Sequence, residues 1–349
     1  MFVAMTTDEK RITLVDHQQA EQLRGGTYLC PACREPVRIK NGQVMPAHFA
    51  HIGPACDVDS EGESTIHLQG KQWLMQLGEQ LGYAVTLEVY YPEIRQRADV
   101  VWQKADRTLI LEFQCSPLKP QRLKERTKGY ASIGLEVIWI LGPHYYSQRP
   151  GNMQAKFLRW DETHGYHLWY SDGSSFLELW QARMGYFEVQ RFSHGPMHMR
   201  QVRVAQSHQK IVRLIDNALH YRERQVMALQ QMAYAQGKHM SGLPWLVHEH
   251  LTALIGLRTL EWQLRAKWLL TFQGGDISRE MNQNFWHEQV TSALTPLVDN
   301  RAIVTTVATV WLELLMQNGY LQRTDQGWQW LKSLEWYVDS VHKLAASRP

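Results

Sequence analysis

The sequence predicts an α/β protein built around a short antiparallel pair of strands. Residues 97–102 and 109–114 alternate apolar and polar side chains, which is the two-residue period of a β-strand, and a polar turn at 104–107 joins them. A third strand precedes the pair, a helical pattern flanks the three strands on each side, and an apolar run typical of a central strand follows. These further elements are expected at residues 84–90, 61–81, 119–130 and 135–141. The order helix, three strands, helix, strand indicates an α/β unit.

Length and composition limit the class of protein. With 349 residues the chain is long enough for two or three domains, and 44% hydrophobic with 20% charged residues is typical of a soluble protein. We find neither a secretory h-region at the start nor an apolar run long enough to cross a bilayer. We therefore expect no membrane segment and a cytoplasmic location. The net charge of +3 only mildly favours a polyanionic partner.

Two acidic residues are expected to face each other on the central strand pair. If the hairpin is symmetric about residues 105–106, Asp99 lies directly opposite Glu112, where Cβ atoms are roughly 4.5–5.5 Å apart and like charges repel. A divalent cation bound between them would remove that repulsion, and Mg²⁺ prefers such oxygen ligands. Gln114 falls on the same face, within reach of a metal-bound water.

The cysteines indicate a metal site rather than disulfides. Cys30 and Cys33 have the C-x-x-C spacing that directs two thiolates at one tetrahedral ion. The chain then folds back, which brings His48 and His51 towards the pair. Cys56 is an alternative fourth ligand, because His-x-x-His is shorter than the usual histidine spacing. We therefore predict a structural Zn²⁺ site, the alternative being two buried free cysteines and surface histidines.

Polar residues on the two flanking helices are candidates for the same site. Glu63, His67 and Lys71 lie four residues apart and so share one face of the helix at 61–81; by itself this could be a solvated stripe. The helix at 119–130 is strongly basic, and its cations are candidates for contacts with phosphate. They are Lys119, Arg122, Lys124, Arg126 and Lys128.

The quoted residues together resemble one family. In chain order these are YLCPAC, HFAH, ESTIH, RADVV, LEFQCS, the pair Arg126-x-x-x-Tyr130, and LEVIWILG, which span roughly residues 28–142. This combination is similar to the CoiA-like competence proteins, whose middle domain belongs to the PD-(D/E)XK nuclease superfamily. The resemblance implies a PD-(D/E)XK nuclease-like core of order αβββαβ, between an N-terminal zinc-binding module and a mainly α-helical C-terminal region.

The resemblance also implies roles for individual residues. Asp99 and Glu112 match the acids that hold Mg²⁺ or Mn²⁺ in the superfamily, Glu63 matches an auxiliary ligand, and His67 becomes a candidate site residue. The usual lysine of E-x-K is replaced by Gln114, as in the family's own E-x-Q form.

Arg126 and Tyr130 occupy the place of the Q-x-x-x-Y pair that some recombination nucleases use near DNA, so both are candidates for DNA binding.

The expected domains are a zinc-finger-like β module at residues 1–60, the nuclease-like domain at 61–148, and an aromatic-rich, mainly helical region at 149–349. The last region ends in a helix followed by a two-stranded hairpin, which is the outline of a winged helix at 302–331; a helical bundle with a terminal hairpin is the alternative.

The sequence thus predicts a metal-dependent deoxyribonuclease acting on single- or double-stranded DNA that enters the cell or recombines. The alternative is a catalytically inactive DNA-binding adaptor, in which Gln114 marks lost chemistry and the C-terminal region recruits recombination proteins. A regulatory protein with zinc alone is a more distant alternative.

Overall fold

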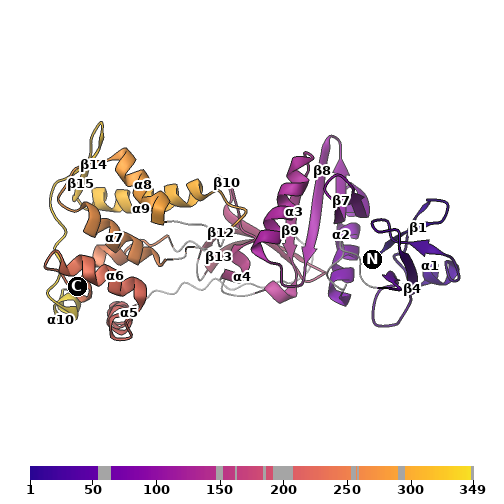
Figure 1. The fold of residues 1–349 in the computed structure, drawn as a ribbon, viewed down its shortest axis with the longest axis horizontal. Coiled ribbons are helices and arrows are strands. Elements are labelled where there is room, and N and C mark those ends of the chain that lie inside the picture. The colour runs from indigo at the N-terminus through magenta and orange to yellow at the C-terminus, as the bar shows by residue number, and fades with distance from the viewer. Residues whose placement is uncertain are drawn as a thin grey trace. The chain divides into compact units, whose positions relative to one another are not determined.

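The computed structural model describes residues 1–53, 64–146, 152–161, 163–183, 186–191, 207–252, 257, 259–289 and 295–346. The chain divides into two compact units, which we describe separately (Figure 1). The first comprises Met1–Gln148, Lys156–Ala182 and Phe187–Gln201, and the second comprises Arg149–Ala155, Arg183–Tyr186 and Val202–Pro349. Cys56 and Glu63 lie outside the described residues.

The first unit begins with a small antiparallel sheet of five strands and one helix. The strand order is β2-β1-β3-β4-β5, and the buried side chains of Leu14, Tyr28 and Phe49 form part of its core. Asp16 caps the helix by accepting a hydrogen bond from the backbone of Gln19. The elements are β1 (Val3–Thr6), β2 (Arg11–Thr13), α1 (His17–Gln22), β3 (Tyr28–Leu29), β4 (Pro36–Lys40) and β5 (His48–His51).

The centre of the first unit has the predicted order of helix, three strands, helix and strand. The elements are α2 (Thr65–Gln80), β6 (Ala84–Tyr91), β7 (Gln96–Lys104), β8 (Arg107–Gln114), α3 (Pro120–Ser132) and β9 (Glu136–Leu141). Strands β6, β7 and β8 pair antiparallel, and β9 joins β8 in parallel. The predicted mixed α/β fold is confirmed.

The same sheet continues beyond β9. Strand β11 pairs with β9 in parallel, through Trp169 and Ile140, and β12 and β13 extend the sheet further. The sheet therefore extends beyond residue 148, where the sequence predicted a domain boundary, because strand β11 of the aromatic-rich region pairs with the central strand β9. The elements are η1 (Pro143–Tyr145), α4 (Asn152–Ala155), β10 (Arg159–Asp161), β11 (Gly165–Ser171), β12 (Phe176–Arg183) and β13 (Tyr186–Arg191).

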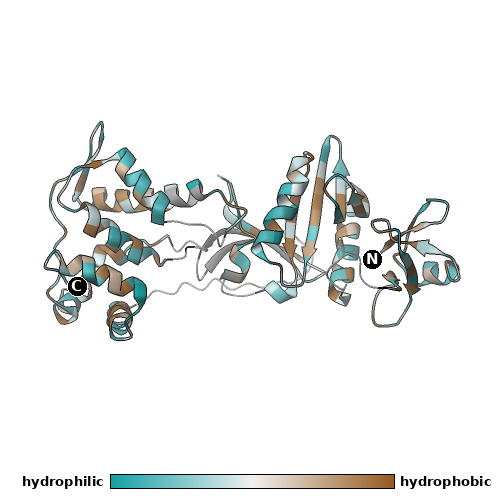
Figure 2. Cartoon of the chain, viewed as in Figure 1, coloured by the Kyte–Doolittle hydropathy of each residue, from teal (hydrophilic) through white to brown (hydrophobic). Residues whose placement is uncertain are grey.

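Helix α2 packs closely on strand β8. The apolar side chains of both elements share one buried cluster, which includes Leu68, Leu74, Leu111 and Phe113, and brown residues gather on the central strands (Figure 2). A Cβ at Gly70 would come within 1.9 Å of the Phe113 ring, so only glycine permits this approach. The close packing brings one face of α2 to the strands that hold the paired acids.

The buried carboxylate of Glu88 on the central sheet forms hydrogen bonds with the N-terminal segment. Glu88 lies in β6 with a φ of +50°, and the pairing of β6 with β7 skips this residue while keeping the same register on both sides of it. Its oxygens accept hydrogen bonds from the backbone nitrogens of Phe2 (2.8 Å) and Val3 (3.1 Å). Lys71 Nζ donates to the same carboxylate at 2.5 Å, and both side chains are fully buried.

The second unit is mainly helical and has a three-stranded sheet of order β14-β16-β15. A helix, a short strand and two further helices precede the β15–β16 hairpin. No helix in the described ranges is long and apolar enough to cross a membrane. The elements are α5 (His208–His220), α6 (Arg224–Tyr234), η2 (Met240–Gly242), η3 (Trp245–His248), α7 (Glu261–Phe272), β14 (Ile277–Ser278), α8 (Arg279–Gln289), α9 (Asn300–Gln317), β15 (Leu321–Arg323), β16 (Gly327–Trp330) and α10 (Ser340–Ala345).

Candidate functional site

The strand register places Asp99 and Glu112 side by side on β7 and β8. Lys104 pairs with Arg107 next to the turn and Val100 pairs with Leu111, so Asp99 and Glu112 come next on their strands. This is the symmetric hairpin that the sequence predicted. Both side chains are largely buried, since Asp99 is 9% and Glu112 is 2% exposed.

Asp99 is held by one strand neighbour and by helix α2. Its Oδ2 accepts hydrogen bonds from the backbone nitrogen of Phe113 at 2.9 Å and from His67 Nε2 at 3.1 Å. The His67 ring in turn stacks on Phe113, with ring centroids 6.2 Å apart. Burial alone would raise the pKa of Asp99, but the adjacent His67, with Lys71 and Arg126, holds that pKa well below its usual range. Asp99 is therefore ionised.

Glu112 is held by helix α3. Its Oε1 accepts hydrogen bonds from Arg126 Nη2 at 2.6 Å and from the Tyr130 hydroxyl at 2.5 Å. The Arg126 guanidinium also lies over the Trp139 ring, 5.4 Å from its centroid. Burial raises the pKa of Glu112 to about 7, against the opposing charge of Arg126 and with a further contribution from Asp99. The two acids thus shift in opposite directions.

Each acid uses one of its two oxygens for the hydrogen bonds described above. Within the described residues, Asp99 Oδ1 and Glu112 Oε2 accept no hydrogen bond, because every bond to these side chains ends on the other oxygen. Two uncommitted carboxylate oxygens on neighbouring strands are ligands that suit a hard divalent cation such as Mg²⁺ or Mn²⁺. The residues present therefore fit such an ion.

Gln114 and Lys71 have other partners. Gln114 is buried, and its Nε2 donates to the backbone oxygen (2.9 Å) and the hydroxyl (3.2 Å) of Ser116. Lys71 donates to Glu88 rather than to either acid. Arg126, by contrast, contacts Glu112 directly.

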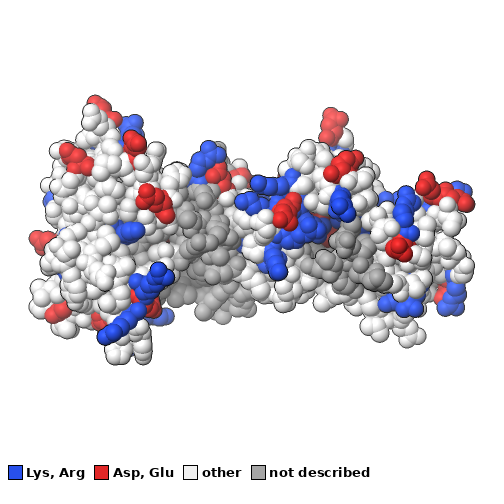
Figure 3. All heavy atoms as spheres, viewed as in Figure 1, with Lys and Arg blue, Asp and Glu red and all other residues white. Residues whose placement is uncertain are grey.

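Helix α3 separates its predicted DNA-binding residues onto two faces. Lys119, Arg122, Lys124 and Lys128 are exposed, and basic side chains gather over this part of the surface (Figure 3). Tyr130 is fully buried and its hydroxyl donates to Glu112, and contact of Tyr130 with DNA stays a prediction. The seven-residue interval from Leu123 to Tyr130 spans two helical turns, which turns both side chains inward.

The N-terminal module contains a possible metal centre formed by Cys30, Cys33 and His51. One ligand atom from each lies within 4.8 Å of the others, and Cys33 Sγ is 3.4 Å from His51 Nε2. His48 is not in this group: its Nδ1 lies 2.8 Å from the backbone oxygen of Pro46. Because β5 is a strand, positions 48 and 51 face opposite sides of the sheet, and the group of three contains His51.

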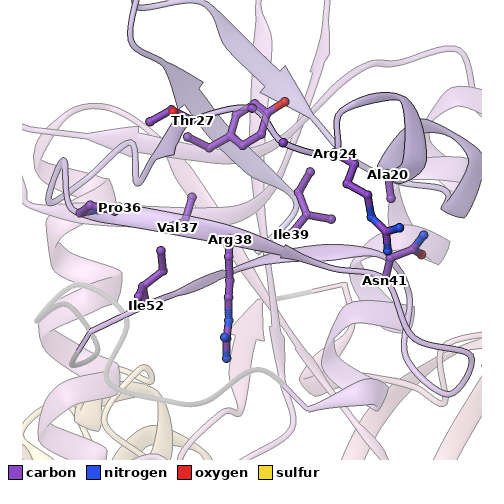
Figure 4. A pocket seen from close by; sticks show the side chains of 12 residues that line it. Ala20, Arg24, Thr27, Pro36, Val37, Arg38, Ile39, Asn41 and Ile52 are labelled. Atoms are coloured by element: carbon purple, nitrogen blue, oxygen red, sulfur yellow. The ribbon is translucent and has the colours of Figure 1, made fainter.

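A pocket of about 400 Å³ also lies on this module, and Figure 4 shows its side chains. Arg24 and Asn41 line it together with Tyr28, Val37 and strand β4. None of its lining residues belongs to the Asp99–Glu112 cluster, so the pocket is separate from the paired acids.

One group of metal-binding residue types was not expected from the sequence. Asp161, His164 and His167 lie together at the β10–β11 hairpin. Their Asp-x-x-His-x-x-His spacing is the signal that could have revealed them.

Comparison with known proteins finds a family match for each of two segments of the chain. Residues 63–194 match the family described as competence protein CoiA, nuclease-like domain, and residues 12–59 match the CoiA N-terminal domain. The chain is 33% identical to competence protein CoiA of Bacillus subtilis (strain 168) over 130 residues, which is 37% of this chain and 35% of the relative. The match thus spans about a third of that relative's length. No solved structure matches the chain.

Proposed function

This chain belongs to the CoiA-like family, and from that premise we propose that it is a metal-dependent deoxyribonuclease acting on DNA that enters the cell or recombines. The observation that supports this proposal most directly is the pair of buried acids, Asp99 and Glu112, each with one uncommitted oxygen. The order of elements from α2 to β9 supports the assignment of this core to the PD-(D/E)XK superfamily. The proposed location is the cytoplasm.

In this proposal Asp99 and Glu112 hold Mg²⁺ or Mn²⁺, with Glu63 as a third ligand. Such an ion lowers the pKa of a bound water and neutralises charge that develops on a phosphodiester. His67 positions Asp99 through its hydrogen bond and its stacking on Phe113.

Two further residues support this site. Gln114 offers neutral donors and one acceptor, so it orients water but adds no charge. Arg126 supplies the positive charge that a lysine at position 114 would give.

DNA is proposed to approach along the exposed face of α3. Lys124 and Lys128 are four residues apart on this face, have no ion-pair partner among the described residues, and lie on the helix that supplies Arg126 to Glu112. Exposed lysines of this kind bind phosphates regardless of base sequence. The face therefore fits single- or double-stranded DNA.

The alternative function is a DNA-binding adaptor without catalysis. The observation in its favour is that Arg126 already neutralises Glu112 at 2.6 Å, which makes a divalent cation unnecessary for the stability of the buried acids. In that case the basic face of α3 binds DNA in the same way with or without metal.

The C-terminal unit is proposed to bind recombination proteins rather than DNA. Its arrangement from α7 to β16 resembles a winged helix, and α9 is the helix that precedes the hairpin. The described exposed positions of α9 include Thr305, Thr309 and Glu313, and Arg301 is paired with Asp299. A helix that lacks unpaired cations is poorly suited to a phosphate backbone.

One experiment distinguishes nuclease from adaptor. Purified protein is incubated with single- and double-stranded DNA in Mn²⁺, and Asp99→Asn and Glu112→Gln are each expected to lower cleavage at least about a hundredfold while DNA binding is largely kept. Asp106→Asn, in the exposed turn of the same hairpin, is the matched control and should cleave like wild type. Equal cleavage by wild type and Glu112→Gln would favour the adaptor.

We propose that the cation at Cys30, Cys33 and His51 is a structural Zn²⁺. The two sulfur donors and one imidazole fit tetrahedral zinc, and Cys56 is the candidate for the fourth ligand. Cys33→Ser should lose one equivalent of zinc per chain and destabilise the N-terminal module. Cys115→Ser, which changes a cysteine in the central core, should keep its zinc. Equal zinc contents of wild type and Cys33→Ser, measured by elemental analysis, would contradict the assignment.

A further inference from the structure

Three side chains that the proposed function does not use converge at the β10–β11 hairpin. Asp161 ends β10 and pairs with Gly165, His164 lies in the turn, and His167 lies on β11 opposite Arg159. The alternation of the strand alone would not bring these residues together; the turn does. One ligand atom from each residue lies within 4.8 Å of the others.

The two oxygens of Asp161 have different surroundings. Oδ1 accepts hydrogen bonds from the backbone nitrogens of Thr163 (2.9 Å) and His164 (2.8 Å), and so closes the turn. His164 Nδ1 lies 2.9 Å from both oxygens, whereas His167 Nδ1 lies 3.6 Å from Oδ2. The hydrogen bonds that close the turn therefore explain the position of Oδ1, but they do not explain the position of His167.

These spacings suit a single ion. Two ligands of a tetrahedral ion with bonds of about 2.05 Å are about 3.3 Å apart, between the two spacings observed at Oδ2. His167 Nδ1 lies 2.9 Å from the backbone oxygen of Gly165, so a cation bound at this nitrogen would displace its proton, which Nε2 or solvent would accept.

Aromatic packing holds both imidazoles in place. The His164 ring lies 4.2 Å from Trp180, and the His167 ring lies 5.0 Å from Trp169, measured between ring centroids. Arg159, which pairs with His167 in the strand register, directs its guanidinium at the backbone oxygen of Val137. The ligand atoms are thus preorganised before any ion arrives.

We propose that Asp161, His164 and His167 bind a divalent transition-metal ion such as Zn²⁺, with a further coordination position open to solvent. Two imidazoles and one carboxylate select transition ions over Mg²⁺, which prefers oxygen ligands. The side chains of Asp161 and His164 are 44% and 31% exposed, so the site is accessible from solvent, whereas His167 is buried beneath it. The site is independent of the proposed nuclease chemistry.

Equilibrium dialysis of the chelator-treated full chain against Co²⁺ tests the proposal. Wild type should bind one equivalent more than His164→Gln and one more than Asp161→Asn. His342→Gln is the matched control, because His342 Nδ1 pairs with Asp339 at 2.7 Å in the same i, i+3 relation, but no second histidine of the described residues joins that pair. It should bind as much as wild type. Equal binding by wild type and folded His164→Gln would overturn the proposal.

A second measurement uses only the wild-type chain and so does not depend on how the variants fold. Diethyl pyrocarbonate modification of His164, read by mass spectrometry, should fall at least about fivefold when Zn²⁺ is present, while modification of His342 stays unchanged. The same modification of His164 with and without Zn²⁺ would show that the three residues only close the hairpin.

Discussion

At the scale of single residues, the paired acids of β7 and β8 are in unlike states. Asp99 is kept ionised by His67, Lys71 and Arg126, whereas burial raises the pKa of Glu112 to about 7. Two neighbouring carboxylates whose pKa values move apart are a common feature of sites that handle protons or metal ions. Here the difference arises because neighbouring positive charges outweigh burial at Asp99 but not at Glu112.

The raised pKa of Glu112 predicts how the stability of the metal-free protein depends on pH. The folded state holds this proton more tightly than the unfolded chain, whose pKa is 4.5, so the stabilisation is complete below about pH 4.5 and is lost as pH rises through about 7. Glu112→Gln does not titrate. The stability of wild type relative to this variant should therefore fall between about pH 5 and pH 8, by at most about 1.4 kcal/mol per pH unit.

Urea unfolding in the presence of a chelator, followed by circular dichroism across this range, measures the difference. A difference that is constant or rises with pH would mean that Arg126 keeps Glu112 ionised throughout.

At the scale of single elements, helix α3 combines two roles on opposite faces. Its inner face supplies Arg126 and Tyr130 to Glu112, and its outer face presents exposed lysines to solvent. The same helix therefore links the proposed DNA path to the buried acids. Any shift of α3 along its axis would change both.

This arrangement predicts the effect of neutralising the outer face. The double substitution Lys124→Ala with Lys128→Ala should weaken binding to all DNA sequences alike and lower the slope of log affinity against log salt by about two. Lys210→Ala with Arg213→Ala, on the exposed face of α5, is the matched control and should leave the slope unchanged. Fluorescence anisotropy over a salt series measures both, and a larger change in the control would place the DNA path on the C-terminal unit.

At the scale of the whole first unit, the N-terminal module and the central sheet share one buried ion pair. Glu88 binds Lys71 and the backbone nitrogens of Phe2 and Val3, and the ammonium of Lys71 lies 5.4 Å from the centroid of the Phe2 ring. Arg11 and Gln72 add hydrogen bonds between the two parts, to the backbone oxygens of Leu87 and Val15. The module is therefore integral to the packing of α2, which also positions His67.

Breaking that ion pair should destabilise the first unit. Lys71→Met removes the ammonium that pairs with the buried Glu88 carboxylate, so the free energy of unfolding should fall by about 3–5 kcal/mol. The matched control is Arg107→Met, which removes an exposed ion pair with Glu136 and should cost less than about 1 kcal/mol. Urea unfolding of both variants measures the effect, and equal losses would contradict the importance of the buried pair.

Sequence reasoning predicted the features that depend on local order along the chain. The period of β7 and β8 and the symmetric turn between them determine that Asp99 and Glu112 are neighbours. The spacing of Cys30 and Cys33 likewise determines that the two thiols lie close together. These relations hold because a strand or a tight turn leaves the backbone few alternatives.

Only the tertiary structure decided which distant side chains meet. The close contact of α2 with β8 at Gly70 places His67 within hydrogen-bond distance of Asp99. The inward face of α3 buries Tyr130 against Glu112, and Lys71 pairs with Glu88 rather than with Asp99 or Glu112. The strand β5 likewise selects His51 over His48. Sequence spacing gives the face of an element on which a residue lies. The packing of one element on another determines which residues that face contacts, because the folded protein must pair its buried charges and fill its core at the same time.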